Sequence, residues 1–393
     1  MTSLTIAKLL KNNGCLTKLV RHAPAMATTV IHLRSETKPM ERRSALSPAS
    51  ATALLEAGYS VHVERSPARA YDDDEFEAVG ARMVPEGSWP NASKDHVILG
   101  LKELPGDGSV LPHAHIQFGH CYKKQHGWAE YLARFANGGG TLYDIEFLTD
   151  EAGCRVAAFG YWAGYAGAAI ALIAWAHQLH RPGTPLGPVP LYDSASSLVD
   201  HVRGRVLAAR GESGPHPNII VIGALGRCGL GAADFCKAAG IPETSILKWD
   251  MAETSKGGPF KEVADSDIFI NCVYVGSTMV PPFVTLESLS KPGRRLRVIA
   301  DVSLDPNNAN NPVPVYSSYT NFNEPTLPVP VGGDGPELTV VGIDHLPTLV
   351  AREASDEFSN LLLPSLLALN CRESEGVWTR AESLYQEKVK ELP

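Results

Sequence analysis

The chain has 393 residues, of which 44% are hydrophobic and 20% are charged. At roughly 100–200 residues per domain, this length predicts two or three domains. The apolar share is too large for an intrinsically disordered chain. Lys and Arg number 35 against 43 Asp and Glu, so the formal net charge is -8. This balance argues against a nucleic-acid-binding protein, which needs a basic face.

Seven cysteines are scattered along the chain without a Cys-x-x-Cys pair. An odd, dispersed set is typical of reduced thiols in an intracellular protein. It predicts neither a disulfide framework nor a cysteine-based zinc site. We therefore expect a soluble intracellular enzyme without a bound metal ion.

The first 35 residues are basic and contain no acidic residue. This composition is typical of a mitochondrial transit peptide. Alternatively, translation starts at Met26, where a strand-like segment begins. We treat residues 1–25 as an N-terminal extension without fixed structure, and we expect the protein to be cytoplasmic.

Extended and helical segments alternate in the first half of the chain. Strands are expected at residues 29–33, 59–63, 96–101, 115–118 and 141–147, and helices at 48–58, 74–79 and 127–135. This alternation is typical of a parallel sheet covered by helices on both faces.

A second alternating region follows. Residues 156–176 carry no charge and are rich in Ala and Gly, which predicts a helix buried between two domains rather than a membrane span. After a Pro- and Gly-rich loop at 181–190, strands are expected at 218–222, 246–249, 268–273 and 297–302. The Pro- and Asn-rich run 305–335 is expected to be irregular. The pattern predicts two α/β domains.

The strongest motif begins with an apolar strand that runs into Gly223, Gly226 and Gly229, before an Ala-rich helix. Glycines at this spacing let the backbone turn tightly and approach a pyrophosphate at the helix N-terminus. The next strand ends at Asp250, close to the offset at which a carboxylate binds the adenosine ribose. Glycine loops also join strands to helices without any ligand. The complete strand–loop–helix–strand–Asp order nevertheless favours a dinucleotide, and the acid favours NAD over NADP.

Ionisable residues lie at the ends of three predicted strands in the N-terminal half. Lys102 and Glu103 follow one strand, and His120 follows the next. Glu146 lies at the end of a third. The carboxyl ends of parallel strands meet at one edge of a sheet, where ligands bind, so these groups predict a cleft suited to proton transfer. The charged run around Arg43 is either part of this site or a solvated surface.

Taken together, these segments resemble the NAD-dependent, lysine-forming saccharopine dehydrogenases of the fungal aminoadipate route. The resemblance extends from about residue 30 to the C-terminus, and several matching stretches are long and peculiar to the family. They include HLRSETKPMERRSALSP, GLKELP, HIQFGHCYKKQHGW, GTLYDIEFL, RVAAFGYWAGYAGAA, IGALGRCGLGA, LKWDMAETSKGGPF and GIDHLP. Alanine dehydrogenases and transhydrogenases are similar only in outline.

The resemblance implies two Rossmann-like domains, each a mostly parallel sheet with helices on both faces, and an active site in the cleft between them. Residues 26–154 and 347–393 would form the substrate domain, and residues 155–346 the NAD-binding domain. The implied reaction is the reversible NAD-dependent cleavage of saccharopine to L-lysine and 2-oxoglutarate, the last step of fungal lysine biosynthesis. We expect small-molecule substrates, no nucleic-acid or membrane partner, and a monomer.

The resemblance also implies roles for individual residues. Lys102 matches the base that acts on the secondary amine, and His120 matches the acid–base of imine hydrolysis. The residues expected to bind substrate are Arg43, Gln125, Arg155, Glu103 and Glu146. The residues expected to bind NAD are Gly223, Gly226, Arg227, Gly229, Asp250, Thr254, Tyr274, Val302, Ile343, Asp344, His345 and Leu346. The family commonly has two consecutive arginines before VAAF, whereas this chain has Cys154 and then Arg155.

Two cysteines are candidates for a redox-sensitive disulfide. Cys228 lies in the glycine loop, and Cys272 ends a later strand of the same predicted sheet. Loop and strand ends meet at the cofactor crevice of a doubly wound sheet, which could bring the two Cα atoms within the roughly 4.4–6.8 Å that a disulfide requires. Such a bond would obstruct the nucleotide. In the alternative, both thiols stay reduced and pack a tight turn.

Two other functions stay open at this point. One is an amino-acid dehydrogenase of the alanine dehydrogenase type. The other is a catalytically silent NAD-binding regulator, which would need the acid–base pair to be missing. Lys102 and His120 are both present.

Overall fold

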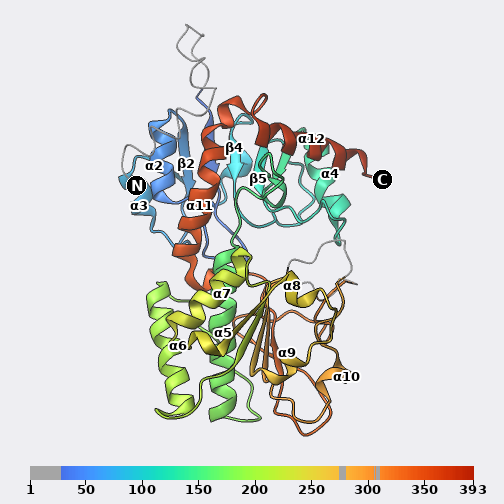
Figure 1. Ribbon diagram of the computed structural model, residues 1–393. Coiled ribbons are helices and arrows are strands. Elements are labelled where there is room, and N and C mark those ends of the chain that lie inside the picture. The colour runs from blue at the N-terminus through green and yellow to red at the C-terminus, as the bar shows by residue number, and fades with distance from the viewer. Residues whose placement is uncertain (1–27, 274–279, 305, 307–309) are drawn as a thin grey trace. The chain divides into compact units, whose positions relative to one another are not determined.

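The computed structural model describes residues 28–273, 280–304, 306 and 310–393. The chain divides into two compact units (Figure 1). Unit 1 is Met1–Ala158 with Ala354–Pro393, and unit 2 is Phe159–Glu353. The predicted N-terminal extension, residues 1–25, and the predicted cofactor residue Tyr274 lie outside the described residues.

Unit 1 contains a six-stranded sheet in the order β3-β2-β1-β4-β5-β6, in which all neighbouring strands are parallel. The strands are β1 (Val30–Leu33), β2 (Ser60–Glu64), β3 (Arg82–Val84), β4 (Val97–Leu99), β5 (Ala114–Gln117) and β6 (Thr141–Asp144). The strand order reverses between β1 and β4. In an open α/β sheet, ligands bind outside the carboxyl ends of the strands at this point.

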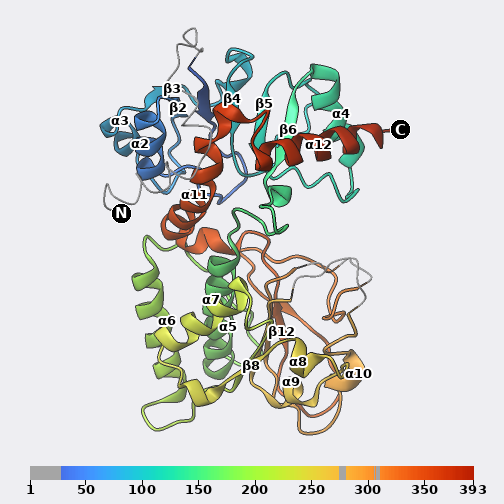
Figure 2. The same cartoon turned by 45° about the horizontal axis from the view of Figure 1, so that its top comes forward.

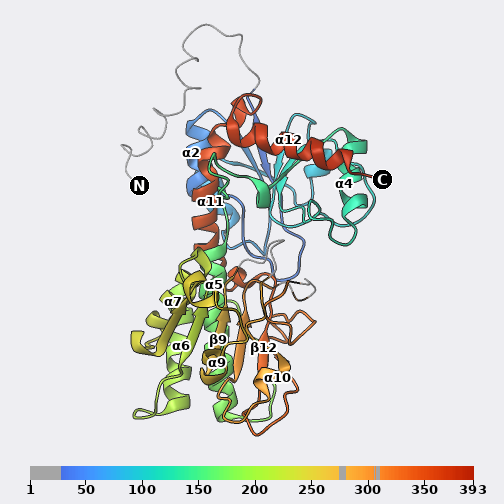
Figure 3. The ribbon, with the colours of Figure 1, turned by 45° about the vertical axis from the view of Figure 1, so that its right-hand side comes forward.

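The helices of unit 1 come from both ends of the chain. They are α2 (Pro48–Glu56), α3 (Asp73–Ala78), α4 (Trp128–Gly138), α11 (Ala351–Leu367) and α12 (Gly376–Lys390), with short 3₁₀ turns at Trp89–Asn91, Ile145–Phe147 and Leu369–Cys371. The unit boundary falls within α11. Helix α12 packs against β6 and α4; Figure 2 shows it beside β6, and Figure 3 shows it beside α4. Tyr385 of α12 lies in one core cluster with Leu132 and Leu142.

Two serines of helix α11 accept hydrogen bonds from the charged run around Arg43, which follows β1. The backbone N–H of Ser44 donates to Ser355 Oγ, and that of Ser47 donates to Ser359 Oγ, both at 2.9 Å. Ser47 then caps α2, because its side chain accepts from the N–H of Ser50, an arrangement that stabilises helix N-termini. The run is therefore largely buried and packed, and is not a solvated surface.

Unit 2 contains a second six-stranded sheet in the order β11-β12-β10-β9-β7-β8. The strands are β7 (Ile219–Ile222), β8 (Ile246–Trp249), β9 (Ile268–Asn271), β10 (Val298–Asp301), β11 (Leu327–Pro328) and β12 (Thr339–Val341). Among the strands of the described residues in this sheet, β11 alone pairs antiparallel. The helices are α5 (Gly160–His180), α6 (Ala195–Arg210), α7 (Arg227–Ala238), α8 (Met251–Thr254), α9 (Lys261–Asp265) and α10 (Leu286–Leu289), with 3₁₀ turns at Glu243–Ser245 and Leu346–Val350.

The uncharged segment at residues 156–176 was expected to be helical throughout. Its helix, α5, begins at Gly160. The helix was expected between two domains, but it packs within unit 2 against α7, α6 and the sheet. Glycines allow this close packing. A Cβ at Gly164 would lie 1.8 Å from the Cys228 carbonyl oxygen, and one at Gly231 would lie 1.9 Å from that of Tyr161. Among the described residues, no helix has the length and apolar character needed to cross a membrane.

Candidate active site

Arg34 and Glu36, which follow β1, form hydrogen bonds that position the backbone at Lys102. The N–H groups of Leu101 and Lys102 donate to the two carboxylate oxygens of Glu36, at 2.7 and 2.9 Å. The Arg34 guanidinium contacts the Lys102 carbonyl oxygen and donates to Glu36 at 3.2 Å. A Cβ at Gly100 would lie 2.3 Å from Arg34 Nε, so a larger residue there would displace the Arg34 guanidinium. Lys102 is buried at the carboxyl end of β4.

His120 and Glu103 form an ion pair between Nδ1 and Oε1. The His120 ring also stacks on Phe118, with ring centroids 6.0 Å apart. Burial opposes a charge on both groups, but the mutual hydrogen bond and opposite charges outweigh it. They lower the pKa of Glu103 to about 2 and raise the pKa of His120. An imidazole held by a carboxylate in this way suits acid–base chemistry.

Asp144, at the end of β6, links the loop of His120 to Glu146. Its Oδ2 accepts from the N–H of Gly119 at 3.1 Å, and its Oδ1 accepts from the N–H of Glu146 at 2.9 Å. This second bond ends the strand at Asp144 and starts a 3₁₀ turn, where the sequence predicted a strand up to residue 147. Burial raises the pKa of Asp144 to about 7. Asp144 was not among the predicted site residues, although its position at a strand end was a usable signal.

Glu146 is the centre of a second group of charges. Its Oε1 accepts from Lys123 Nζ at 2.7 Å and from Arg155 Nη2 at 3.0 Å. The structure thus brings Glu146 and Arg155 together. Gln125 contacts only the backbone of this group in the bonds described, since its Oε1 accepts from the N–H of Lys123 at 3.1 Å. The structure adds Lys123, which sequence reasoning missed because exposed lysines are common in loops.

Arg43 is engaged within the chain. Its guanidinium forms two hydrogen bonds with the Glu41 carboxylate, at 2.8 and 2.6 Å, and both side chains are buried. Burial raises the pKa of Glu41, but the charges of Arg43 and Lys102 outweigh burial and lower it. The pair borders a small polar pocket that Arg34, Glu36 and Arg69 also line.

In unit 2, the glycine loop folds back on the end of β8. Gly223 has a φ of 85°, and its N–H donates to the Trp249 carbonyl oxygen at 2.9 Å. A Cβ at Gly229 would lie 2.2 Å from the Gly223 carbonyl oxygen, whereas a Cβ at Gly226 would meet nothing closer than 3.5 Å. The chain itself therefore does not require a glycine at position 226. Bare backbone at the start of α7 fits a pyrophosphate that approaches closely.

Asp250 lies against this loop. Its Oδ2 accepts from the N–H of Leu225 at 3.0 Å, and its Oδ1 accepts from the N–H of Met251 at 2.8 Å. The Thr254 hydroxyl donates to the Asp250 carbonyl oxygen at 2.9 Å. The predicted ribose carboxylate thus lies beside the predicted pyrophosphate loop.

The other predicted cofactor residues follow strands of the same sheet. Arg227 is the first residue of α7, and Val302 follows β10 and packs against Gly167 of α5. Ile343 follows β12 and bridges to Thr320, and His345 packs edge-on against Phe322. Asp344 is exposed and Leu346 is buried. Because these strands are parallel, their carboxyl ends form one edge of the sheet.

Cys228 and Cys272 are brought together as free thiols. Cys228 lies in the first turn of α7, and the N–H of Cys272 donates to the Ile222 carbonyl oxygen at 2.8 Å. Burial and then the hydrogen-bonded Cys228 thiol raise the pKa of Cys272. The disulfide between them stays a prediction.

Comparison with known proteins decides the family. The model for the N-terminal domain of alanine dehydrogenase/PNT matches residues 32–166. The Neurospora crassa NAD(+), L-lysine-forming saccharopine dehydrogenase is 55% identical over 94% of this chain and 98% of its own length. The Schizosaccharomyces pombe protein of the same name is 52% identical over 93% of this chain and 100% of its own. The chain belongs to the L-lysine-forming saccharopine dehydrogenase family.

The fold of this saccharopine dehydrogenase family member is similar to that of a solved structure. An L-alanine dehydrogenase superposes with a TM-score of 0.65 at 19% identity, and the match covers 93% of this chain and 100% of that protein. At this identity the likeness shows the fold alone. The predicted family and the predicted fold class, two α/β Rossmann-like domains with mostly parallel sheets, are confirmed.

Proposed function

We propose that the protein catalyses the reversible cleavage of saccharopine to L-lysine and 2-oxoglutarate, with NAD as its cofactor. The observation that carries this proposal is the identity of 52–55% to two relatives named for that activity, over nearly the whole of all three chains. The glycine loop and Asp250 support NAD, because they provide bare backbone for a pyrophosphate and a carboxylate for the ribose.

The residues at the carboxyl ends of β4 and β5 suit the proton transfers of this reaction. NAD, when bound at the glycine loop and Asp250, would supply the acceptor for the hydride that leaves the carbon next to the bridging amine of saccharopine. The amine must first be neutral, and in this proposal Lys102, in its neutral form, takes its proton. Water must then add to the resulting carbon–nitrogen double bond. His120, held through Nδ1 by Glu103, has Nε2 available to move protons to and from that water.

The charged residues around Glu146 suit the ends of the substrate. Saccharopine carries three carboxylates and an ammonium group. In this proposal Arg155, which has 34% of its side chain exposed and contacts Glu146, binds a carboxylate through its guanidinium. Glu146 is a counter-charge for the ammonium. Arg43 already binds Glu41 in two places, so we propose that it supports the pocket wall and binds substrate only if Glu41 releases it.

We further propose that the enzyme is a cytoplasmic monomer. The five cysteines that the structure shows as free thiols, Cys121, Cys154, Cys228, Cys236 and Cys272, suit a reducing compartment. Sedimentation of the purified chain tests the monomer, and fractionation of the source cells tests the location. A dimer, or enzyme confined to an organelle, would contradict this part of the proposal.

The activity is tested by following NADH oxidation with lysine and 2-oxoglutarate. We expect a rate that needs both compounds and falls to background when either is omitted. Ammonia with pyruvate serves as the control for an alanine dehydrogenase and should give no rate. Turnover with ammonia and pyruvate, but not with lysine and 2-oxoglutarate, would overturn the proposal.

A further inference from the structure

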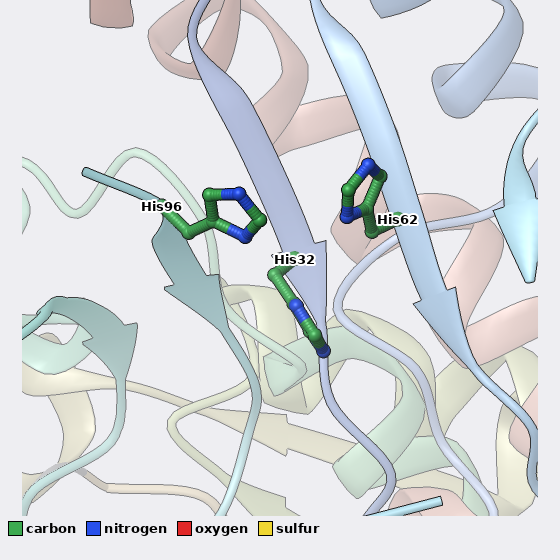
Figure 4. Close-up of side chains that lie close together, drawn as sticks. All are labelled: His32, His62 and His96. Carbon is green, nitrogen blue, oxygen red and sulfur yellow. The ribbon is translucent and has the colours of Figure 1, made fainter. Parts of the chain in front are cut away.

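Three histidines lie together on one face of the unit 1 sheet (Figure 4). His32 of β1 and His62 of β2 are register partners. His96 directly precedes β4, at the level of Val30, because Ile31 pairs with Val97. Side chains at alternate positions share a face, so all three rings lie on the same side. One nitrogen from each ring lies within 4.8 Å of the other two.

The two nitrogens of His32 have different surroundings. Nε2 lies 3.3 Å from Glu64 Oε1, whereas Nδ1 is buried without a hydrogen-bond partner. His96 also has a buried Nδ1 without a partner. Buried polar atoms are normally paired, so two such atoms in one cluster need an explanation. A cation between the rings would supply one.

We propose that His32, His62 and His96 bind a Zn²⁺ ion, with His32 as a ligand through Nδ1. Imidazole is a preferred zinc ligand. The contact between His32 Nε2 and Glu64 is the carboxylate–histidine arrangement that orients metal ligands. The two other rings are partly exposed, which leaves room for water as a fourth ligand.

The distances need only a small adjustment. A point equidistant from three nitrogens 4.8 Å apart lies about 2.8 Å from each, whereas Zn–N bonds are about 2.0–2.1 Å long. If His32 stays in place, rotation of the His62 and His96 side chains that moves each nitrogen by at most about 1.5 Å closes this gap. The charges that act on His62 and His96 include Asp95, which favours a cation, and Arg82, which opposes one.

This site is separate from the candidate active site. His96 lies at the amino end of β4, whereas Lys102 follows its carboxyl end. Cysteine patterns could not reveal it, because its ligands are histidines from three separate strands or strand ends. The predicted absence of a metal ion therefore rested on the cysteines alone.

The test uses the full chain after treatment with a chelator, titrated with ZnCl₂ at pH 7.5 in a calorimeter. We expect one Zn²⁺ per chain. His62→Gln and His96→Gln should each weaken binding at least about tenfold, since each removes a ligand. The control is His216→Gln in unit 2, a histidine with a buried, unpartnered Nδ1 outside the cluster; it should bind as the parent does.

Binding of Co²⁺ in place of zinc gives a second test, which needs no variants. Co²⁺ bound by three imidazoles and water should show ligand-field absorption without a thiolate charge-transfer band. X-ray absorption of the zinc complex should fit nitrogen neighbours at about 2.0 Å. Failure of the parent chain to bind zinc would overturn the proposal. So would sulfur neighbours, or undiminished binding by the His62→Gln/His96→Gln double variant.

Discussion

Glu103 and His120 leave neighbouring parallel strands, β4 and β5, and meet as an ion pair between Oε1 and Nδ1. The pair fixes the orientation of the imidazole and leaves Nε2 as the nitrogen that can exchange a proton with substrate or water. The pair also couples the protonation of the two groups, because the charge on each side chain favours the charged form of the other.

The first prediction concerns this coupling. Glu103→Gln removes the carboxylate that raises the pKa of His120, so that pKa should fall. Neutral His120 would then predominate at lower pH, and the limb of the pH profile of kcat/KM that His120 controls should move to lower pH. NMR titration of the His120 ring measures the shift directly. Glu130→Gln, on the exposed side of α4, is the control; equal titration of His120 in all three proteins would disprove the coupling.

Lys102→Met should lower kcat by about 10²–10⁴-fold, the usual effect of removing a general base. The side chain keeps its length and apolar stem, so the buried position should tolerate it. NADH binding, measured by fluorescence titration, should be nearly unchanged. Lys94→Met changes an exposed lysine before β4 and should leave kcat as it is. Full turnover by the Lys102 variant would remove it from the mechanism.

The two arginines predicted to bind substrate should behave differently. Arg155→Ala should raise the KM for 2-oxoglutarate with little loss of stability, since Arg155 is partly exposed. Arg43→Ala leaves the buried Glu41 carboxylate without its main partner. Breaking a buried pair in this way costs about 3–5 kcal/mol. Steady-state kinetics and urea unfolding separate the two effects.

The double variant Arg43→Gln/Glu41→Gln tests the cause of that instability. It removes both charges and should recover part of the lost stability. Arg65→Ala, which breaks an exposed ion pair with Glu77, should cost much less. If Arg43→Ala instead folds normally and raises only the KM for a substrate, its contact with Glu41 is not structural.

Asp250→Ser should weaken NADH binding and reduce the preference of the enzyme for NADH over NADPH. The carboxylate lies beside the glycine loop and would repel a 2′-phosphate. Serine also caps helices, so α8 should keep its start at Met251. The ratio of kcat/KM for NADH to that for NADPH is the measurement. An unchanged ratio would place ribose recognition at other residues.

The sequence predicted most of the strands because apolar runs and glycines mark them. It missed β3 (Arg82–Val84), a three-residue strand that contains an arginine and has no fully buried residue. It also missed β12 (Thr339–Val341), which follows a long run poor in regular structure. Neither α11 nor α12 was predicted. The packing of α11 within unit 1 involves hydrogen bonds between residues far apart in the chain, such as that from the Ser44 N–H to Ser355 Oγ, which local patterns cannot show.

The sequence indicated which residues belong to the candidate site, but not which of them contact each other. Strand ends located Lys102, Glu103 and His120, yet no pattern showed that Glu103 contacts His120. The Arg43–Glu41 pair was hidden for another reason. In sequence, a charged run indicates a solvated surface as readily as a site, and only its packing under α11 shows that it is buried. The histidine cluster needed the register of β1 with β2 and β4, which the sequence does not give.

The most direct test of the proposed activity is the identity of the product formed from lysine, 2-oxoglutarate and NADH. Mass spectrometry with lysine labelled by ¹⁵N at its ε-amine should find one new compound that retains both carbon skeletons and the label. It should form in a 1:1 ratio to the NADH oxidised, with one water lost. Labelled lysine recovered unchanged while 2-oxoglutarate is reduced, or no oxidation of NADH at all, would contradict the account.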